Sequence, residues 1–223
     1  DVISFTGSTS VGKMIAKSCA ETLKPVILEL GGKDPMIILK DANMNRAVES
    51  ALFGGLSNCG QTCISTEEVF VENEIFDSFV GMISERIKKI KAGKDEFADL
   101  GPMIMEENGG KVNDHLVEIE NQCSVVRGEQ DSGSMFIAPA IVINPPEDAK
   151  IVNEETFGPI ISIRKFSNDN ELLKKIHNTG YGLSSSIFSS NKKRINKIIK
   201  EMKTGNVSIN DVMTHYGIAS LPF

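Results

Sequence analysis

The chain of 223 residues has no tryptophan, two tyrosines, three histidines and only four cysteines. The cysteines are irregularly spaced in a chain too large to depend on disulfides, a pattern that predicts thiols in a reducing compartment. They are Cys19, Cys59, Cys63 and Cys123. No second pair of cysteines or histidines follows Cys59 and Cys63 at a zinc-like spacing, which argues against a structural metal site. We therefore expect a cytoplasmic protein without a bound metal.

Long apolar runs and an excess of basic charge are also absent. No segment approaches the roughly 20 apolar residues that cross a bilayer, and Asp1 to Phe5 has the pattern of a strand rather than of a secretory signal. The net charge of -6 disfavours general binding to nucleic acid or to anionic membranes. Hydrophobic residues make up 40% of the chain and charged residues 24%, as in ordinary globular proteins. We expect neither nucleic-acid nor membrane partners.

Residues 1–30 follow the order strand, turn, helix, strand. Val2 to Phe5 is apolar and partly β-branched, Thr6 to Ser10 has turn chemistry, and a helix follows to about Leu23. Val26 to Leu28 is a short apolar run typical of a buried parallel strand. The segment predicts a βαβ unit that is incomplete as a domain.

Residues 31–223 begin with the break Gly31-Gly32-Lys33-Asp34-Pro35. After it, the apolar residues alternate between the spacing of strands and the spacing of helices. Strands are expected at Met36–Leu39, Glu68–Glu72, Ala140–Ile143, Ile160–Phe166, Ser184–Phe188 and Val207–Asn210. Helices are expected from an Asp41 N-cap to Leu56 and at Glu74–Lys91, Glu106–Glu120, Asp169–Asn178 and Asn191–Lys203. This alternation favours an α/β fold with a mostly parallel sheet flanked by helices. Because the first residue lies inside an apparent strand and Leu221 to Phe223 lack a polar tail, we expect a truncated piece of a longer chain.

A glycine-flanked turn, Gly7-Ser8-Thr9-Ser10-Val11-Gly12, lies between the first strand and the first helix. Backbone N–H groups and a helix N-terminus can bind a pyrophosphate at such a place. Only Gly7 and Gly12 are glycines, so the segment is not the full dinucleotide fingerprint. A turn with a capping serine explains it equally well.

Two residues are candidates for catalysis. Glu29 ends an apolar strand, where a carboxylate is costly unless it is paired, solvated or functional, and ligands bind at the carboxyl ends of strands in open α/β sheets. It is either a general base or a carboxylate bonded to the N–H groups of the following glycine turn. A single cysteine is usually an inert small hydrophobe, but Cys63 follows the polar loop 57–62, whose N–H dipoles can activate a thiol.

The segment Glu154-Glu155-Thr156-Phe157-Gly158-Pro159 places two carboxylates and an aromatic ring before a strand. Gly158-Pro159 is sufficient to explain it as a turn. As a binding segment, a carboxylate would hold ribose hydroxyls with Phe157 near a flat ring. The three histidines are scattered and none is assigned as a ligand, and surface positions are expected for the two on helices. They are His115, His177 and His215.

In this order and with these separations, the segments resemble the aldehyde dehydrogenase superfamily. The matching runs are Phe5–Gly12, Leu28–Pro35, Gly60–Cys63, Glu154–Pro159, Tyr181–Leu183 and Gly205–Asn210. Cys63 follows Glu29 by 34 residues, which fits the separation of base and nucleophile in that family. The resemblance covers essentially the whole chain.

The resemblance implies that Cys63 is the nucleophile of an enzyme that oxidises an aldehyde to a carboxylic acid. The Cys63 thiolate attacks the aldehyde to give a thiohemiacetal, hydride passes to NAD or NADP, and Glu29 activates the water that hydrolyses the thioester. The implied cofactor-binding residues are Gly7, Ser8, Gly12, Leu30, Gly31, Glu155 at the nicotinamide ribose and Phe157 beside the ring.

It also implies that residues 1–30 are the C-terminal piece of a Rossmann-like NAD(P)-binding domain and that residues 31–223 are a catalytic domain truncated at its C-terminal end. The parent enzyme is expected to be a homodimer or homotetramer. His215 and Tyr216 are candidates for the wall of the substrate pocket, although a surface loop is equally consistent.

Two alternatives remain. A coenzyme A-acylating dehydrogenase is the alternative within the enzyme class, but acylating relatives typically lack the glutamate that stands here as Glu29. In a different class, the chain alone is a structural or assembly fragment. The oxyanion-hole asparagine and most of the cofactor domain would precede Asp1, so we expect the chain by itself to be inactive.

Overall fold

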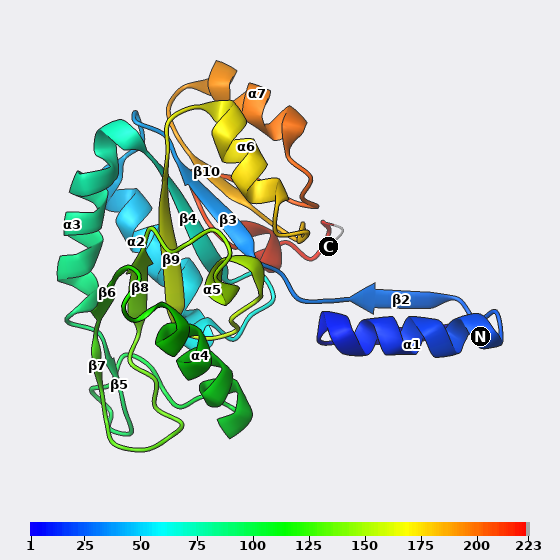
Figure 1. The fold of residues 1–223 in the computed structure, drawn as a ribbon. Helices are drawn as coiled ribbons and strands as arrows, with labels where there is room; N and C mark the ends of the chain where they lie inside the picture. Colours follow the sequence, from blue (N-terminus) through cyan, green and yellow to red (C-terminus); the bar gives the residue numbers. More distant parts are fainter. Residues whose placement is uncertain (222–223) are drawn as a thin grey trace.

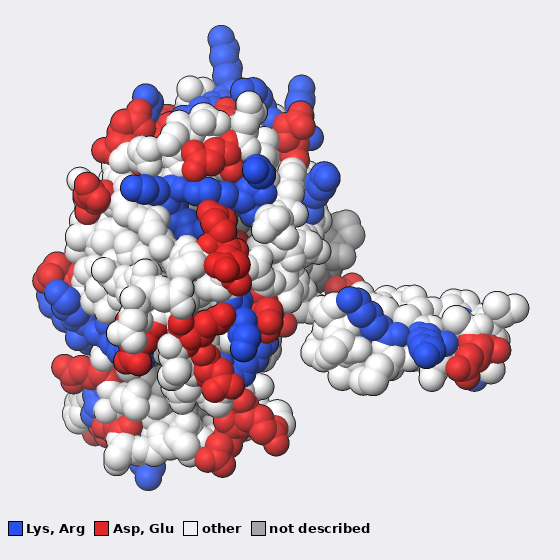
Figure 2. Space-filling view, in the orientation of Figure 1, with Lys and Arg blue, Asp and Glu red and all other residues white. Residues whose placement is uncertain are grey.

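The computed structural model describes residues 1–221, and Pro222 and Phe223, the last residues of the expected catalytic domain, lie outside them. A seven-stranded sheet with helices on both faces forms the main body. Residues 1–30 project from this body as a separate unit, which we call the arm (Figure 1). Acidic and basic side chains are interspersed over the visible face (Figure 2). Within residues 1–221, no helix has the length and apolar character needed to cross a membrane.

The arm has the predicted order of strand, helix and strand. It consists of β1 (Ile3–Thr6), α1 (Thr9–Glu21) and β2 (Val26–Glu29). The two strands pair in parallel, with Ile3 opposite Val26 and Thr6 opposite Glu29. A two-stranded sheet with one helix buries little, so large apolar side chains of the arm stay exposed, among them Met14, Leu23 and Ile27.

The large sheet has the strand order β11-β10-β3-β4-β9-β8-β6. Its strands are β3 (Asp34–Ile38), β4 (Thr66–Glu72), β6 (Ser124–Arg127), β8 (Ala140–Ile143), β9 (Ile160–Phe166), β10 (Ser186–Phe188) and β11 (Ser208–Ile209). Every neighbouring pair is parallel except β6 and β8, which are antiparallel. The predicted α/β fold with a mostly parallel sheet is therefore confirmed.

Helices cover both faces because successive residues of each buried strand point to opposite sides. Met36 and Val69 pack on one face with α2 (Met44–Leu56) and α3 (Phe76–Ile87). Ile37 and Phe70 pack on the other face with α6 (Asp169–His177) and α7 (Lys192–Glu201). On that same side of β8, Val142 packs with α4 (Glu106–Ile119) and the short α5 (Lys150–Asn153). The layers are visible in Figure 1.

One predicted cap was wrong. Asn43, not Asp41, caps α2, and its side chain accepts a hydrogen bond from the N–H of Arg46. Asp41 instead accepts hydrogen bonds from the hydroxyls of Ser189 and Ser190, each at 2.6 Å. Both residue types cap helices well, so the choice depended on a tertiary contact that the local sequence does not reveal.

Short elements escaped the sequence analysis. They are β5 (Lys91–Ala92), β6, β7 (Glu129–Gln130), α5 and the 3-10 turns Ser57–Gly60, Asn73–Ile75 and Thr214–Gly217. Elements this short give only a weak apolar period, although β10 and β11 are as short and were predicted. The antiparallel edge strand β6 has only two apolar residues, Val125 and Val126, and was missed.

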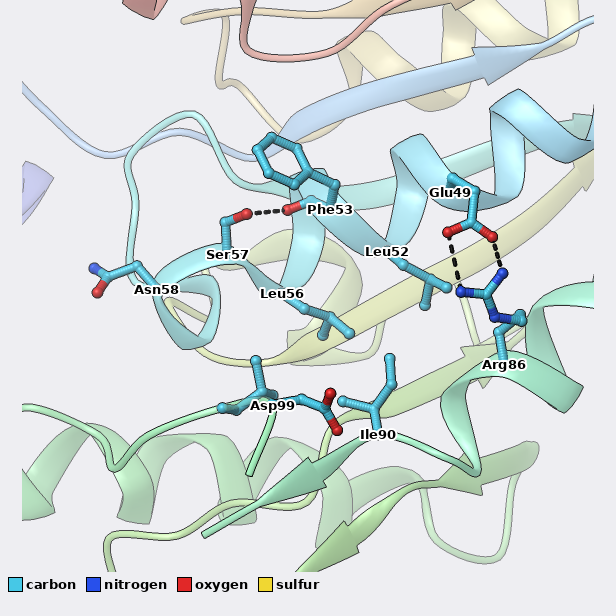
Figure 3. A pocket seen from close by; sticks show the side chains of 10 residues that line it. Glu49, Leu52, Phe53, Leu56, Ser57, Asn58, Arg86, Ile90 and Asp99 are labelled. Carbon is cyan, nitrogen blue, oxygen red and sulfur yellow. Dashed lines mark hydrogen bonds and ion pairs between the residues drawn. The ribbon is translucent and has the colours of Figure 1, made fainter. Parts of the chain in front are cut away.

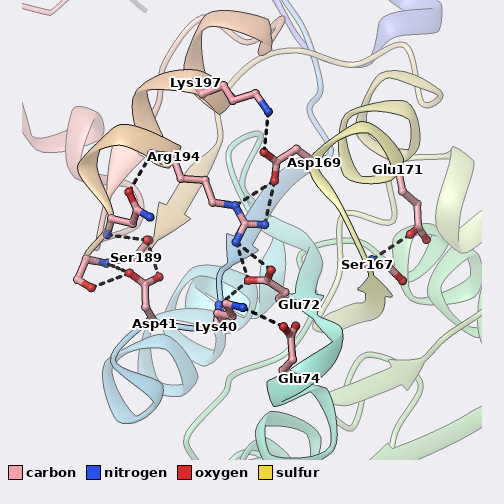
Figure 4. A network of polar contacts seen from close by, with 12 residues as sticks. Lys40, Asp41, Glu72, Glu74, Ser167, Asp169, Glu171, Ser189, Arg194 and Lys197 are labelled. Atoms are coloured by element: carbon pink, nitrogen blue, oxygen red, sulfur yellow. Dashed lines mark hydrogen bonds and ion pairs between the residues drawn. The ribbon is translucent and has the colours of Figure 1, made fainter.

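The two ends of the large sheet differ in composition. The loops that precede β3, β4, β9 and β10 meet at the amino ends of the strands, and these loops contain Gly31, Cys63 and Glu155. At the carboxyl ends, Arg194 on α7 forms ion pairs with Glu72 and Asp169 at 2.8 Å each (Figure 4). This network joins α6, α7 and β4.

Candidate active site

A pocket of about 490 Å³ lies between the arm and the amino ends of the large sheet. Eight of the nine sequence-predicted site residues line it: Gly7, Ser8, Glu29, Leu30, Gly31, Cys63, Glu155 and Phe157. The carboxyl end of β2 thus faces the thiol loop that precedes β4. Segments up to about 150 positions apart in the sequence meet at one cavity, as required for a site that combines a nucleophile, a base and a binding carboxylate.

The ninth residue, Gly12, does not line this pocket. It is buried in α1, and a Cβ atom there would lie 2.5 Å from Cδ2 of Leu30. Glycine at this position lets α1 pack directly on the chain that leaves β2. Ser8 combines both of its predicted roles, because it lines the pocket and its hydroxyl caps α1 by accepting a hydrogen bond from Val11 N–H.

The nucleophile loop runs through the 3-10 turn that follows α2. Asn58, Cys59 and Gly60 all have positive φ angles, which turn the chain sharply before Cys63. Cys63 itself is half-buried. Burial raises the pKa of its thiol and the negative charge of Asp34 raises it further, whereas the backbone N–H groups of Ile64 and Cys63 lower it. Those N–H groups can stabilise a thiolate or an oxyanion formed beside it.

Cys59 differs from Cys63 although the two thiols belong to one loop. Cys59 is buried, burial raises its thiol pKa, and its Sγ donates a hydrogen bond to the carbonyl of Gly101 at 3.1 Å. It does not line the pocket. Only one of the two thiols is therefore placed to meet a ligand there. All four cysteines are free.

Glu29 lines the pocket with its side chain partly exposed. Its carboxylate accepts no hydrogen bond from any residue between 1 and 221. The glycine turn does not hold it, since the N–H of Gly32 donates to Oε1 of Glu155 at 3.2 Å. Of the two interpretations offered by the sequence, the hydrogen bond to the turn is therefore wrong.

A buried ion pair shapes the loop that carries Glu155 and Phe157. The Lys33 amine lies 2.8 Å from Oε2 of Glu67, and it also donates to the carbonyl of Glu154 at 2.9 Å. Glu67 in turn accepts the N–H groups of Thr156 and Phe157 at 2.8 Å. These bonds hold Phe157 at a φ of 53°, a left-handed conformation that a side chain of this size rarely adopts.

Glu155 is positioned by the glycine turn opposite. A Cβ on Gly31 would collide with the Glu155 carboxylate, so only glycine allows this close approach. Burial and the charge of Glu67 raise the pKa of Glu155, whereas the Gly32 N–H and the Lys111 and Lys33 ammonium groups lower it. A carboxylate that is held in place but still lines the pocket can accept hydrogen bonds from ligand hydroxyls.

Six further lining residues were not assigned as site residues in the sequence analysis: Thr6, Gln61, Thr62, Asn108, Lys111 and Tyr216. Lys111 on α4 donates a hydrogen bond to the carbonyl of Glu155. Asn108 and Lys111 belong to a helix whose apolar spacing predicted only a structural role, and no local signal marked them. Tyr216 had been considered as a pocket wall and lines the pocket, whereas His215 is buried nearby in the chain.

The expected surface position of His115 on α4 was wrong. Its side chain is 2% exposed, with Nδ1 at 3.3 Å from the Thr156 hydroxyl and Nε2 at 3.8 Å from Oε2 of Glu154. Burial lowers the pKa of His115, and the positive charges of Lys111 and Lys33 lower it further. His115 therefore packs as a neutral side chain beneath the loop of Glu155.

Another hollow, of about 380 Å³, lies between α2, α3 and the chain near Leu100 (Figure 3). The ion pair of Glu49 and Arg86 crosses one side of it. It contains none of the sequence-predicted site residues, and its walls combine apolar side chains such as Leu52 and Leu56 of α2 with polar and charged ones. The chemistry-bearing groups are concentrated in the first pocket.

The residues of the first pocket have the chemistry that a dinucleotide requires. The turn after β1 and the N-terminus of α1 have N–H groups of the kind that bind phosphates, and the Glu155 carboxylate has acceptors of the kind that bind hydroxyl groups. The glycine at position 31 lets the Glu155 carboxylate approach the main chain at the edge of the pocket. A thiol, a separate carboxylate and a flat-ring site in one cavity can support covalent oxidation followed by hydrolysis.

Comparison with known proteins gives a consistent result. The chain matches the Aldehyde dehydrogenase family over residues 1–223. It is 32% identical to the 4,4'-diapolycopene aldehyde oxidase of Methylomonas sp, an alignment that covers 100% of this chain and 42% of that protein. It is also 32% identical to the NADP(+) succinate-semialdehyde dehydrogenase of Escherichia coli K12, over 93% of this chain and 44% of that protein.

Solved structures agree. A crystal structure of betaine aldehyde dehydrogenase from Staphylococcus aureus in complex with NAD+ has a TM-score of 0.89 at 33% identity, over 95% of this chain and 44% of that one. A variant of the aldehyde dehydrogenase from Bacillus cereus has a TM-score of 0.89 at 31% identity, with the same coverage. The chain thus spans less than half the length of these relatives.

Proposed function

Because this chain belongs to the aldehyde dehydrogenase family, we propose that the full-length protein oxidises an aldehyde to a carboxylic acid with NAD or NADP as the hydride acceptor. The observation that carries the proposal is the single pocket that joins Cys63, Glu29 and Glu155. Semialdehyde and betaine aldehyde dehydrogenases among the relatives support a small aldehyde as substrate.

Cys63 is the nucleophile in this proposal. Its thiolate attacks the aldehyde carbon, and the backbone N–H of Cys63, which donates to no other backbone group within residues 1–221, stabilises the oxyanion of the thiohemiacetal. The nicotinamide, when bound, accepts the hydride and leaves a thioester on Cys63. Removing the thiol proton is costly in this half-buried site, so access of a base or of water to the pocket matters for the first step.

Glu29 is the general base for the second step. Its carboxylate accepts no hydrogen bond within residues 1–221 and borders the same cavity, so it can take a proton from a water molecule that attacks the thioester. The product carboxylate then leaves and restores the thiol. This role favours hydrolytic release over transfer of the acyl group to coenzyme A.

The cofactor residues are assigned by position. Gly7, Ser8 and the start of α1 would face the pyrophosphate, with Leu30 and Gly31 along the dinucleotide. Glu155 would hold the nicotinamide ribose, and Phe157 would lie beside the ring. Gly12 would act indirectly, by allowing α1 to pack on Leu30.

The remaining proposals concern the whole protein. Residues 1–30 are the C-terminal piece of the cofactor domain and residues 31–223 belong to the catalytic domain. The exposed apolar side chains of the arm support this division, because a complete cofactor domain would cover them. We place the enzyme in the cytoplasm as a homodimer or homotetramer and expect the chain alone to be inactive.

Replacing the thiol tests the function. In the full-length protein, Cys63→Ala should lower reduction of NAD or NADP by a panel of aldehydes at least about 1,000-fold. Cys59→Ala is the matched control, since it removes the other thiol of the same loop and should keep most of the turnover. Full turnover by Cys63→Ala would disprove the proposal.

Product analysis separates hydrolysis from acyl transfer. Glu29→Gln should form the thioester in a burst and then release acid slowly, and added coenzyme A should not restore the wild-type rate. Formation of acyl-coenzyme A by the wild-type enzyme would instead identify the acylating type.

A further inference from the structure

A buried carboxylate without an assigned role lies next to the nucleophile loop. Asp34 is the first residue of β3 and is 4% exposed. Its Oδ1 accepts a hydrogen bond from the N–H of Ser184 at 3.0 Å, whereas its buried Oδ2 has no hydrogen-bond partner in the described part of the chain. A charged oxygen in this position is costly, so the site favours a proton on Oδ2.

Asp34 and Cys63 lie close together because Gly32, which has no side chain, lies between the Cys63 carbonyl and the Asp34 carboxylate. A Cβ built on Gly32 would collide with the carbonyl oxygen of Cys63 and lie 3.1 Å from Oδ1 of Asp34. Asp34 is also paired in the sheet with Thr66, three residues after Cys63. The thiol therefore senses the charge on this carboxylate, which raises the pKa of Cys63.

Asp34 also borders a small cavity of about 10 Å³, room for one water-sized guest. Its walls are Asp34, Pro35, Ile64, Thr66, Ser184, Ser185, Ser186, Val212 and Met213. Four of these residues carry hydroxyl groups, which can accept a hydrogen bond from a carboxylic acid or hold a water that does so. Because Oδ2 has no hydrogen-bond partner among the described residues, a water in this cavity would be the acceptor for a proton on Asp34.

The charged groups around Asp34 are mainly of its own sign. Burial raises the pKa of Asp34 most, to about 7, the hydrogen bonds from Ser184 lower it, and the charges of Glu67 and Glu155 raise it further. Lys33, the neighbouring residue, does not neutralise Asp34, because its amine bonds to Glu67 and to the carbonyl of Glu154. With Cys63, these are the ionisable groups that face it.

We propose that Asp34 is a positioning residue for the nucleophile: the charge state of its buried carboxyl group, which borders the hydroxyl-lined cavity, sets how readily Cys63 becomes a thiolate. Ionising either group makes ionising the other harder, so the two compete for one negative charge. A neutral Asp34 favours the thiolate, and an ionised Asp34 disfavours it. The inference rests on the proposed function of Cys63 and adds a residue that controls when the thiol is reactive.

The test is the pH profile of thiol alkylation in the full-length protein without cofactor. Iodoacetamide labelling of Cys63 is followed by site-resolved mass spectrometry from pH 5 to 10, with Cys63→Ala as the background. Asp34→Asn should react at the wild-type rate near pH 5.5, where wild-type Asp34 is already neutral. It should react about three- to tenfold faster near pH 8, where wild-type Asp34 is largely ionised.

Asp41→Asn is the matched control. It removes an identical charge just beyond the other end of β3, about 20 Å away at roughly 3.3 Å per residue, and should leave the profile unchanged. If Asp34→Asn does not fold, Asp34→Ser removes the same charge with a smaller side chain and has the same expected profile.

The inference would be overturned if the ratio of the Cys63 alkylation rates of Asp34→Asn and wild type stayed constant across the pH range, at one or at any other value. A purely structural role predicts that this ratio does not depend on pH. Turnover of aldehydes by Cys63→Ala would overturn the proposed function as well. An inactive Cys63→Ala together with a constant ratio would refute only the role of Asp34.

Discussion

Two ion pairs of the same composition lie at opposite ends of β3 and β4. Lys33 and Glu67 are 2.8 Å apart at the amino ends, with side chains 0% and 3% exposed. Lys40 and Glu74 are 3.0 Å apart at the carboxyl ends, with side chains 57% and 56% exposed. The same chemistry therefore operates in two environments within one strand pair.

The buried pair organises the pocket, whereas the exposed pair does not organise its surroundings. Lys33 and Glu67 use their remaining hydrogen-bonding capacity on the main chain of Glu154, Thr156 and Phe157. The exposed lysine and glutamate are solvated on most sides, and such pairs contribute about 0–1 kcal/mol. Burial converts an ion pair from a minor surface contact into the support of a binding loop.

Carboxylates at the two ends differ in the same way. At the amino ends, burial raises the pKa of Asp34, Glu68 and Glu155. At the carboxyl ends, burial opposes ionisation of Asp169 but hydrogen bonds from Arg194 and Lys197 outweigh it and lower the pKa (Figure 4). The carboxyl groups at the amino ends of the strands therefore bind protons more readily. At the carboxyl ends, ion pairs and hydrogen bonds keep Asp169 ionised.

The largest expected effect comes from breaking the buried pair. Lys33→Met leaves the Glu67 carboxylate buried without its cation, and the free energy of unfolding should fall by about 3–5 kcal/mol. The KM for the cofactor should rise as the loop of Phe157 loosens. Urea unfolding and steady-state kinetics measure the two effects. The double variant Lys33→Met/Glu67→Met should recover only part of the stability, because Glu67 also holds two N–H groups.

The next effect concerns Asp34 and pH. Its pKa is raised from 3.8 to about 7 on folding, so its contribution to stability is fully present below pH 4 and is lost as the pH rises through 7. Relative to wild type, Asp34→Asn should therefore gain stability between pH 4 and pH 8, by roughly 4 kcal/mol from the shift in pKa. Thermal or urea unfolding at several pH values checks this, and a difference independent of pH would contradict it.

A smaller effect is expected at the carboxyl ends. Arg194→Met breaks the bonds to Glu72 and Asp169 and should lower the free energy of unfolding by about 2 kcal/mol, since Glu72 is buried but Arg194 and Asp169 are only partly buried. The kcat should not change, because the network lies at the other end of the sheet. Lys197→Met is the control, as this side chain contacts the same Asp169 but is 71% exposed. Comparable losses in both variants would refute the argument from burial.

The smallest effect completes the comparison. Lys40→Met removes the exposed counterpart of the Lys33 pair, and the free energy of unfolding should hardly change, with any difference shrinking in high salt. A loss similar to that of Lys33→Met would show that burial is not what distinguishes the two ends.

The sequence predicted the elements that carry long apolar periods and the segments that form the pocket. Glu29, Cys63 and Glu155 each adjoin a glycine-containing turn beside a strand, but this local signal left alternatives open, and their roles were assigned from the order and separation of the segments that resemble the family. Lys111 and Asn108 carried no such signal, since their contribution depends on how α4 packs against the loop of Glu155. Lys33 and Glu67 were missed for the same reason: their burial and pairing follow from the register of β3 and β4.

The loop that carries Cys63 and the loop that carries Glu155 and Phe157 touch through their main chains. Gly60 has a φ of 69°, and a Cβ there would collide with the carbonyl of Gly158. The spacing between the two loops is thus set by backbone atoms, whereas the outer wall of the pocket is made of side chains such as Tyr216. In the proposed enzyme, exchange of wall residues would change the substrate preference and leave the spacing between the two loops intact.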